Sequence, residues 1–299
     1  MAFQHGPVQV RVPATSANLG SGYDSFGLAI SRYDDVCASV TGAGLQVRVS
    51  GCGSGEVALD GQHLVVQAMR ACFDVLGGQP PGLQVSCTNQ IPHGRGLGSS
   101  AAAIVSGIVL ARALTEDGPQ LLDDPAALAL ATELEGHPDN VAACLLGGAT
   151  VAWMADGVGR AVRLPPVTAH PVLFIPSEQS ATHLARAALP VTVPHADAAF
   201  NLSRAALLVL ALSGRPDLLL AATEDRLHQA YRQHSMPATA SLVARLREAG
   251  VAAMVSGAGS AVLALAAGED QGALACALVP PSWECVQLRV AEGAQIVPR

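Results

Sequence analysis

The residues best suited to chemistry stand in one short run that alternates glycine with other residues and continues into two serines. This run reads Pro92-His93-Gly94-Arg95-Gly96-Leu97-Gly98-Ser99-Ser100-Ala101-Ala102. Glycine has no Cβ, so its backbone can approach a phosphate closely. Serine hydroxyls can cap a helix, contact a phosphate or coordinate Mg²⁺. We therefore predict that this run is a phosphate-binding loop.

The segments that flank this loop place it between a strand and a helix. Residues 83–88 alternate apolar with polar side chains, which is the period of a strand, and residues 101–114 are rich in helix-forming types. The first turn of a helix carries unpaired N–H groups and the positive end of the helix dipole, and both favour an anion. A tight strand-to-helix turn that binds nothing remains the alternative interpretation of this segment alone.

All 17 basic residues of the chain are arginines, and this excludes several classes of enzyme. A Walker A loop needs a lysine after its last glycine, where this chain has Ser99. Protein kinases need a strand lysine, and pyridoxal enzymes need a lysine for the Schiff base. The chain also lacks G-x-S-x-G, so the nucleophile elbow of an α/β-hydrolase is not expected.

The composition predicts a soluble, cytoplasmic protein with one large or two medium-sized domains. The chain has 299 residues, half of them hydrophobic but only 3% aromatic, and its net charge of −7 argues against binding to nucleic acid or to an anionic membrane. Its seven cysteines are an odd number without C-x-x-C, which favours reduced thiols. No secretory signal is recognisable, and the apolar stretches are shorter than the roughly 20 residues of a membrane span.

Hydrophobic periodicity predicts the elements of the first half of the chain. A strand over residues 8–12 is expected to stop at Pro13. Asp124-Pro125 is expected to cap a helix that runs to about Glu135, and residues 136–140 are expected to break it. Further strands are predicted at 28–40, 45–49 and 149–154, with a loop at 18–22 and a helix at 63–76.

The proline-rich segment 163–171 is the best candidate for a domain boundary, and it divides the chain into residues 1–164 and 165–299. Beyond it the pattern predicts a strand at 172–175. Two further strands at 251–255 and 261–266 are expected to form a hairpin around a glycine-rich loop. Helices are predicted at 181–188, 199–212, 216–227 and 238–249.

Four segments resemble the signatures of the GHMP kinase family, in the form found in its homoserine kinase branch. They are Pro13-Ala14-Thr15-Ser16-Ala17-Asn18-Leu19-Gly20-Ser21-Gly22-Tyr23-Asp24, Gly96-Leu97-Gly98-Ser99-Ser100-Ala101-Ala102, Glu135-Gly136-His137-Pro138-Asp139-Asn140 and Ser256-Gly257-Ala258-Gly259-Ser260. Their order and spacing span nearly the whole chain. The segment 135–140 points to the homoserine branch rather than to the galactose, mevalonate or phosphomevalonate branches.

The resemblance implies an α+β, two-domain GHMP kinase fold. A ribosomal-S5-like N-terminal domain would bind ATP, with the adenine pocket near Val65 and in the segment before Ile91. A ferredoxin-like C-terminal domain would complete the substrate site. The implied reaction is ATP-dependent phosphorylation of the side-chain hydroxyl of L-homoserine to O-phospho-L-homoserine, on the way to threonine. Mg²⁺ is the implied cofactor and a small molecule the implied partner, without nucleic acid or membrane, while a homodimer stays open.

The resemblance also assigns roles to residues around the phosphate-binding loop. Ser100 and Glu135 would hold Mg²⁺, and Glu135 is expected at the end of a helix, where the dipole disfavours its charge. Asp139 would meet the substrate ammonium, while His137 and Asn140 would lie near the reacting hydroxyl. An amide cannot take a proton at neutral pH. We therefore expect that the hydroxyl proton passes to the phosphate during transfer.

The remaining candidates bind the amino-acid part of the substrate. Arg186 and Arg232 match two family arginines and would hold the carboxylate, for which a guanidinium offers a bidentate fork. The family places Asn18 at the substrate hydroxyl, and Gly257 of the C-terminal glycine motif is a further candidate. Asp24 lies close enough in its motif to serve as a substrate ligand or as an alternative base.

Other interpretations of these residues remain open at this stage. Within the family, the alternative is another small-alcohol kinase that acts on shikimate or a mevalonate-like substrate. A catalytically silent nucleotide-binding protein would keep the loop, but the intact Ser100, Glu135 and Asn140 argue against it. A hydride-transferring Rossmann enzyme is disfavoured because the glycine-rich loop lies far from the first strand. Each arginine could also be an ordinary surface residue of a helix.

Overall fold

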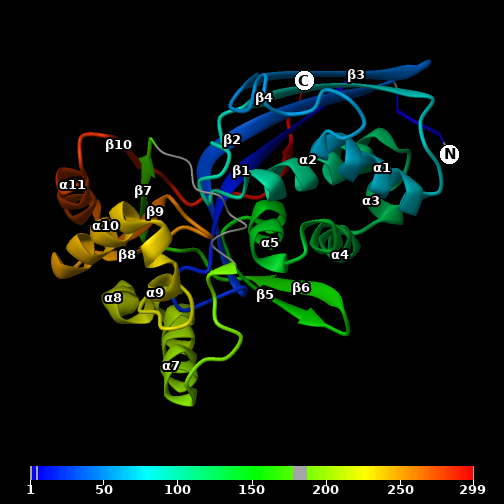
Figure 1. The fold of residues 1–299 in the computed structure, drawn as a ribbon. Coiled ribbons are helices and arrows are strands. Elements are labelled where there is room, and N and C mark those ends of the chain that lie inside the picture. Colours follow the sequence, from blue (N-terminus) through cyan, green and yellow to red (C-terminus); the bar gives the residue numbers. More distant parts are fainter. Residues whose placement is uncertain (1, 5, 178–186, 299) are drawn as a thin grey trace.

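The computed structural model describes residues 2–4, 6–177 and 187–298, which form two β-sheets covered by helices (Figure 1). The larger sheet follows the order β11-β1-β2-β4-β3, and β5 and β6 extend it from β2. The α+β class is confirmed, as are the strands predicted at 28–40, 45–49, 83–88 and 149–154. The strands of the larger sheet are β1 (Val8–Ala17), β2 (Phe26–Thr41), β3 (Gly44–Gly51), β4 (Gly82–Asn89), β5 (Ala149–Ala155), β6 (Val158–Arg163) and β11 (Gln295–Ile296).

Strand β1 does not stop at Pro13, so that expectation is wrong. The strand runs on to Ala17, and its register against β2 shifts between Pro13 and Ala14. A proline cannot donate a ladder hydrogen bond, but a strand tolerates it at such an irregularity. The extra length matters because it carries Thr15 and the following residues to the centre of the molecule.

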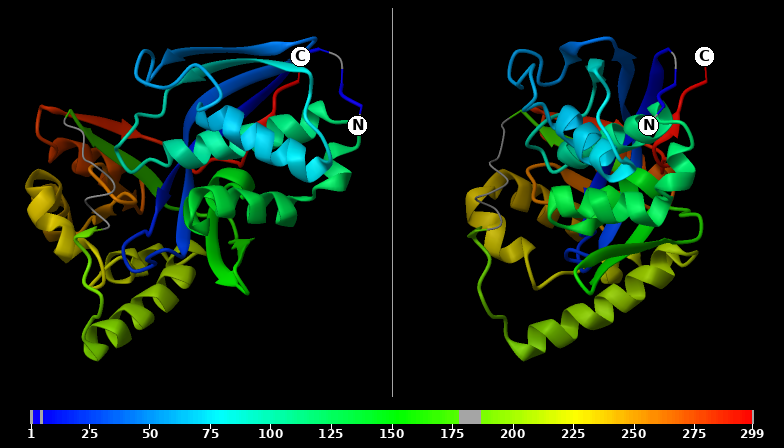
Figure 2. Two further views of the ribbon diagram at one scale, coloured as in Figure 1. Left: turned by 45° about the vertical axis from the view of Figure 1, so that its right-hand side comes forward. Right: turned by 90° about the vertical axis from the view of Figure 1, so that its right-hand side faces the viewer.

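The helices of the first half cover one face of the larger sheet (Figures 1 and 2). Most side chains of the helix that follows the phosphate-binding loop are buried, as expected for a helix that is apolar all round. Gly107 lets this helix approach the first one, since a Cβ there would meet the carbonyl of Val65. The helices are α1 (Leu64–Leu76), α2 (Ser99–Leu114), α3 (Gly118–Leu121), α4 (Asp124–Glu135) and α5 (Pro138–Leu146).

Two expectations around α4 need correction. The capping residue is Asp123 rather than Asp124, because its carboxylate accepts the backbone N–H of Ala126 at 2.9 Å. The break after Glu135 is also shorter than expected, since helix α5 already begins at Pro138. Proline at the first helical position has a suitable φ and lacks only an N–H that would have no partner there. Asp139 and Asn140 therefore lie in the first turn of a helix rather than in a loop.

The smaller sheet is antiparallel, with the order β10-β7-β9-β8. The predicted hairpin around the glycine-rich loop is confirmed as β8 and β9. The helix predicted at 181–188 lies mostly outside the described residues. The elements are β7 (His170–Pro176), α7 (His195–Leu212), η1 (Pro216–Leu218), α8 (Leu219–Ala222), α9 (Gln229–Arg232), η2 (Gln233–Ser235), α10 (Pro237–Glu248), β8 (Ala252–Val255), β9 (Val262–Ala266), α11 (Glu269–Ala277) and β10 (Trp283–Gln287).

The single helix predicted over residues 216–227 is wrong. Its place is taken by η1, α8 and a turn that leads into α9. The carboxylate of Asp225 accepts the backbone N–H groups of Leu227, His228 and Gln229. A side chain that binds neighbouring backbone groups in this way competes with helical hydrogen bonds, and it fixes the turn instead.

The C-terminal tail returns from the smaller sheet to the larger one. The N–H of Ala291 donates to Ala29 at 3.0 Å, and β11 pairs with β1. Among the described strands that come after residue 164, β11 is the one that joins the larger sheet, and the others form the smaller sheet. The C-terminal strand β11 thus lies at the edge of the larger sheet opposite β3. The boundary at 164–165 remains a prediction.

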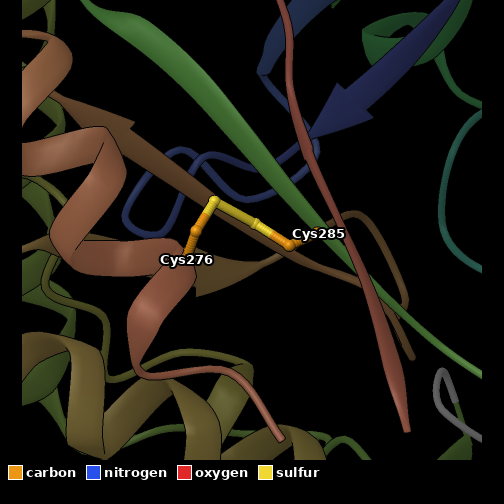
Figure 3. Close-up of a disulfide and its surroundings, with 2 residues drawn as sticks. All are labelled: Cys276 and Cys285. Atoms are coloured by element: carbon orange, nitrogen blue, oxygen red, sulfur yellow. A yellow bond between two sulfur atoms is a disulfide. The ribbon is translucent and has the colours of Figure 1, made fainter. Parts of the chain in front are cut away.

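Two of the seven cysteines form a disulfide, so the expectation of reduced thiols fails for them. Cys276 of α11 is bonded to Cys285 of β10 (Figure 3). The other five are free, and burial raises the pKa of the Cys72 and Cys87 thiols to about 12. Buried, protonated thiols of this kind are unreactive.

Within the described ranges, no helix has the length and apolarity to cross a membrane.

Candidate active site

A cavity of about 400 Å³ lies where loops from the two sheets meet, and it gathers most of the predicted site residues. The loop after β1, the loop before α2 and the α4–α5 junction contribute from the larger sheet. Helix α9 and the β8–β9 loop contribute from the smaller one. The lining residues are Ala17, Asn18, Asp24, Gly94, Gly96, Leu97, Gly98, Ser99, Ser100, Glu135, His137, Asp139, Asn140, Arg232, Gly257 and Ala258.

The phosphate-binding loop is shaped by glycines in left-handed conformations. Gly94, Gly96 and Gly98 have φ values of 64°, 73° and 66°, and Gly98 is the residue that caps α2. A Cβ on Gly96 would collide with the carbonyl of Ser256 from the β8–β9 loop. The Ser256 hydroxyl donates to the carbonyl of Gly96 at 2.7 Å. The loop therefore needs glycine both for its backbone conformation and for contact with the other sheet.

Some residues of the predicted loop lie away from this cavity. Arg95 is buried and donates through Nη2 to the carbonyl of Ser177 at 2.7 Å, and burial lowers its pKa. Its guanidinium thus binds the end of β7. Ala101 is buried in the core, and Pro92 does not line the cavity.

Ser100 and Glu135, the two residues of the metal prediction, form a hydrogen-bonded pair in the lining of the cavity. Ser100 Oγ donates to Glu135 Oε1 at 2.6 Å. Glu135 is the last residue of α4, and burial raises its pKa, while the hydrogen bond from Ser100 and the charge of His137 act in the opposite direction. A half-buried carboxylate beside a hydroxyl would gain from a hard divalent cation, which prefers oxygen ligands.

His137, Asp139 and Asn140 are held by the first turn of α5. His137 Nδ1 lies 2.7 Å from Asp139 Oδ1, and the same oxygen accepts the backbone N–H of Asn140 at 2.7 Å. Asp139 is only 2% exposed, so its carboxylate mainly orients these two neighbours. Thr15 Oγ1 donates to Asn140 Oδ1 at 2.8 Å, which leaves the Nδ2 amide as the donor end of that side chain. Thr15 was not predicted as a site residue, although it stands in the first motif.

Asn18 joins the first motif to the C-terminal glycine motif. Its Nδ2 donates to the carbonyl of Gly257 at 3.0 Å, and its Oδ1 accepts the backbone N–H of Asp24 at 2.9 Å. Both Asn18 and Asp24 have positive φ angles, of 72° and 52°. The amide of Asn18 is thus engaged in holding the cavity together, whereas its predicted role was at the substrate hydroxyl.

Arg232 reaches the same cavity from α9, although its side chain is largely buried. The residue is 3% exposed, and Nη1 donates to the carbonyl of Gly257 at 3.2 Å. Its guanidinium carbon also lies 5.8 Å from the centre of the Tyr23 ring. The second predicted arginine, Arg186, lies outside the described residues.

A second cavity of about 370 Å³ adjoins the first at Ser99 and Ser100. His63 is buried in its wall, and its Nδ1 has no hydrogen-bond partner within the ranges that the structure covers. Burial lowers the pKa of His63, and the nearby His93 lowers it further. The lining residues are Asp34, Val36, Val57, Ala58, Gln62, His63, Leu64, Val65, Cys87, Asn89, His93, Ser99, Ser100, Ala102, Ala103 and Ser106.

The second cavity contains residues that motif analysis could not single out. Val65 and Asn89 occupy the region where the resemblance implied an adenine pocket. His63 and Asp34 were not predicted, because neither belongs to one of the four motifs or stands at a spacing that indicates a ligand. Only the fold brings them next to the phosphate-binding loop.

The chain matches the family models of both GHMP kinase domains. The GHMP kinases N terminal domain matches residues 63–148, and the GHMP kinases C terminal model matches residues 205–278. The chain is 54% identical to the homoserine kinase of Streptomyces coelicolor, over 99% of this chain and 96% of that protein. It is 52% identical to the homoserine kinase of Clavibacter michiganensis, over 95% and 91% of the two chains.

Solved structures share the fold along the full length. The homoserine kinase of Cytophaga hutchinsonii superposes with a TM-score of 0.84 at 24% identity, covering 99% of this chain and 100% of that one. A mevalonate kinase of L. major superposes with a TM-score of 0.67 at 17% identity, covering 97% of each chain. The chain matches both family models and shares more than half of its residues with a full-length relative. Together with the four motifs, one of which contains the predicted phosphate-binding loop, these matches show that this chain belongs to the homoserine kinases of the GHMP kinase family.

Proposed function

We propose that the protein transfers the γ-phosphoryl group of ATP to the side-chain hydroxyl of L-homoserine and releases O-phospho-L-homoserine. One observation carries this proposal beyond the family match. A single cavity joins the N-terminus of α2 to a buried arginine and to several carboxylates. This combination suits a phosphate donor on one side and a free amino acid on the other.

In this proposal, ATP spans both cavities. The nucleoside occupies the cavity around His63, and the phosphates extend past Ser99 and Ser100 to the first turn of α2. Four N–H groups at a helix start have no intrahelical partner, and together with the dipole they stabilise phosphate charge. This supply of N–H groups matters here because the chain has no lysine to neutralise the phosphates.

We further propose that Ser100 and Glu135 hold Mg²⁺ together with phosphate oxygens. The two side chains fit this ion because both offer oxygen ligands 2.6 Å apart in the lining of the cavity. Mg²⁺ in kinases commonly takes one or two carboxylates and completes its shell with substrate phosphates and water. When bound, Mg²⁺ neutralises charge that develops on the transferred phosphoryl group.

The amino acid would lie between α9 and the start of α5. Arg232, together with Arg186, would bind the carboxylate, and Asp24 and Asp139 supply negative charge for the ammonium. Asp24 is the more accessible of the two, because Asp139 is 2% exposed and already accepts two hydrogen bonds. With its Oδ1 bound to Thr15, Asn140 can donate from Nδ2 to the substrate hydroxyl.

We propose that no side chain acts as a dedicated base. The Asn140 amide cannot accept the hydroxyl proton at neutral pH. Phosphoryl transfer depends chiefly on alignment and charge neutralisation, so the proton can pass to the phosphate as the transfer proceeds. Asp24 remains the alternative base.

We also propose a cytoplasmic location, a small-molecule partner rather than nucleic acid or membrane, and leave a homodimer as an option.

The test is a coupled ADP-release assay with L-homoserine, shikimate, mevalonate, galactose, L-serine and L-threonine as acceptors. We expect the highest kcat/KM for homoserine. Serine is one methylene shorter, and a misplacement of about 1 Å can cost about 100-fold in rate. The Glu135→Gln variant, purified in parallel, shows whether the ADP release belongs to this chain. Equal specificity constants for serine and homoserine, or faster turnover of another alcohol, would reject homoserine as the substrate.

A further inference from the structure

His228 is a fully buried histidine beside the candidate carboxylate-binding arginine. It precedes α9, its side chain is 0% exposed, and its ring lies 5.3 Å from the ring of Tyr23 in the first motif. The sequence motifs give His228 no role, and it does not line the 400 Å³ cavity. It does contact Arg232, which lines that cavity.

The surroundings of the ring determine which nitrogen carries the hydrogen. Nε2 lies 2.8 Å from the carbonyl oxygen of Gly20 and 3.6 Å from Oδ2 of Asp225, and both are acceptors. Nδ1 lies 3.3 Å from Nη1 of Arg232. A guanidinium has only N–H donors. A neutral ring therefore satisfies both sides only when Nε2 carries the hydrogen and Nδ1 accepts from Arg232.

The backbone around His228 is fixed by Asp225. Its Oδ2 accepts the N–H of His228 at 3.1 Å and that of Gln229 at 2.7 Å, and its Oδ1 accepts the N–H of Leu227 at 2.9 Å. The turn before α9 is consequently rigid, so the imidazole has a defined position relative to the guanidinium one helical turn later.

Burial favours the neutral form of the ring, while the charges around it act in both directions. Burial is the largest influence and lowers the pKa of His228, and the positive charge of Arg232 lowers it further. Asp225, the carbonyl of Gly20 and Asp24 act in the opposite direction. A protonated ring would place a second cation against Arg232 and would remove the acceptor at Nδ1.

We propose that His228, neutral and protonated on Nε2, is a positioning residue that orients Arg232 for the substrate carboxylate. Arg232 Nη1 lies between two acceptors, Nδ1 of His228 and the carbonyl of Gly257. Two acceptors at one nitrogen restrict rotation of the planar guanidinium, and a bidentate pair with a carboxylate depends on that orientation. The inference rests on the proposed function, in which Arg232 binds homoserine.

Two substitutions at His228 each keep the hydrogen bond on one side of the ring and remove the bond on the other side. In His228→Gln the side-chain amide reaches the position of Nε2 and can donate to Gly20, but the acceptor for Arg232 is lost. In His228→Asn the side-chain oxygen takes the position of Nδ1 and can accept from Arg232, but the bond to Gly20 is lost. His195→Asn, at the exposed start of α7, is the matched control for replacement of a histidine.

We expect His228→Gln to raise KM for homoserine about tenfold or more, because a lost hydrogen bond to a charged group costs about that factor. His228→Asn should raise it less than about threefold, and both variants should keep KM for ATP within about twofold. His195→Asn should change neither constant. Equal effects of the two His228 variants on KM for homoserine, or equal changes in KM for homoserine and ATP, would overturn the positioning role.

A spectroscopic measurement on the unmodified protein tests the tautomer directly. A long-range ¹H–¹⁵N spectrum of the histidine-labelled protein at pH 7, assigned by loss of the His228 signals in His228→Asn, should show a neutral ring protonated on Nε2. A ring protonated on Nδ1, or a charged ring, would overturn the proposal even where kinetics agree. If the protein does not phosphorylate homoserine at all, the proposed function fails, whereas the tautomer can still be measured.

Discussion

Replacement of Arg232 by lysine should selectively weaken binding of homoserine. Arg232 is 3% exposed, and its guanidinium donates to the carbonyl of Gly257 at 3.2 Å. Lysine keeps the positive charge, but it presents a point charge where a planar fork can meet a carboxylate in a bidentate pair. The loss of a buried, hydrogen-bonded charge partner costs about 2–5 kcal/mol. Even about 2 kcal/mol corresponds to about a 30-fold increase in KM for homoserine, at about 1.4 kcal/mol for each factor of ten.

The matched control is Arg226→Lys. Arg226 is also an arginine of the segment before α9, but its side chain is 51% exposed and pairs with Asp197 at 3.3 Å. Its guanidinium carbon lies 3.8 Å from the centre of the Phe200 ring, and the residue does not line the 400 Å³ cavity. An exposed ion pair contributes little. This variant should therefore leave both Michaelis constants within about twofold of those of the unmodified protein.

The assay measures KM for homoserine and for ATP in both variants, with Tm as the check on folding. Because the phosphate-binding loop belongs to the larger sheet, KM for ATP should stay within a few-fold in Arg232→Lys. An increase confined to ATP, an increase equal for both substrates, or the same increase in Arg226→Lys would refute the carboxylate-binding role of Arg232.

Three further predictions concern the loop, the metal pair and the second cavity. Ser100→Ala and Glu135→Gln should each lower kcat, because each removes a proposed Mg²⁺ ligand and raises the activation barrier by several kcal/mol. Burial raises the pKa of Glu135, so above that pKa the ionised carboxylate lowers the stability of the folded protein. Glu135→Gln should therefore not lower Tm at neutral pH. Unchanged kcat at saturating Mg²⁺ would contradict the assignment of these two residues as metal ligands. Gly96→Ala should lower Tm more than Gly55→Ala, because both have positive φ but a Cβ has open space only at Gly55; equal losses in thermal unfolding would show that contact with the other sheet is unimportant. His63→Leu should raise KM for ATP a few-fold, by about 1 kcal/mol, and His63→Asn should raise it less; a change in KM for homoserine alone would place the nucleoside elsewhere.

The sequence predicts the phosphate-binding loop well because its signal is local. Alternating glycines and following serines specify a left-handed turn and a helix start, and Gly94, Gly96 and Gly98 have those conformations. The pairing of Ser100 with Glu135 has a different source, because only the family resemblance pairs these two residues, and the structure places their side-chain oxygens 2.6 Å apart. Where a residue type is needed for its own backbone conformation, the local sequence is enough to predict that conformation.

The sequence fails where competing interactions come from residues far along the chain. Arg95 stands inside the phosphate-binding loop, yet its guanidinium binds the carbonyl of Ser177. His63 gains its position in the second cavity only from the packing of α1 beside α2. Each of these outcomes depends on tertiary neighbours that spacing cannot reveal.

The contacts that assemble the site also hold the two sheets together. Asn18 donates to Gly257, Ser256 donates to Gly96, and His228 contacts Gly20, so each of these bonds joins a residue before 164 to one after it. Ser100 and Glu135, in contrast, both belong to the helices of the larger sheet. Loss of the bond from Asn18 to Gly257 or of the bond from Ser256 to Gly96 should therefore lower Tm and raise KM for homoserine together. A substitution in the metal pair should lower kcat while Tm is kept, and this difference separates residues that build the site from residues that act in it.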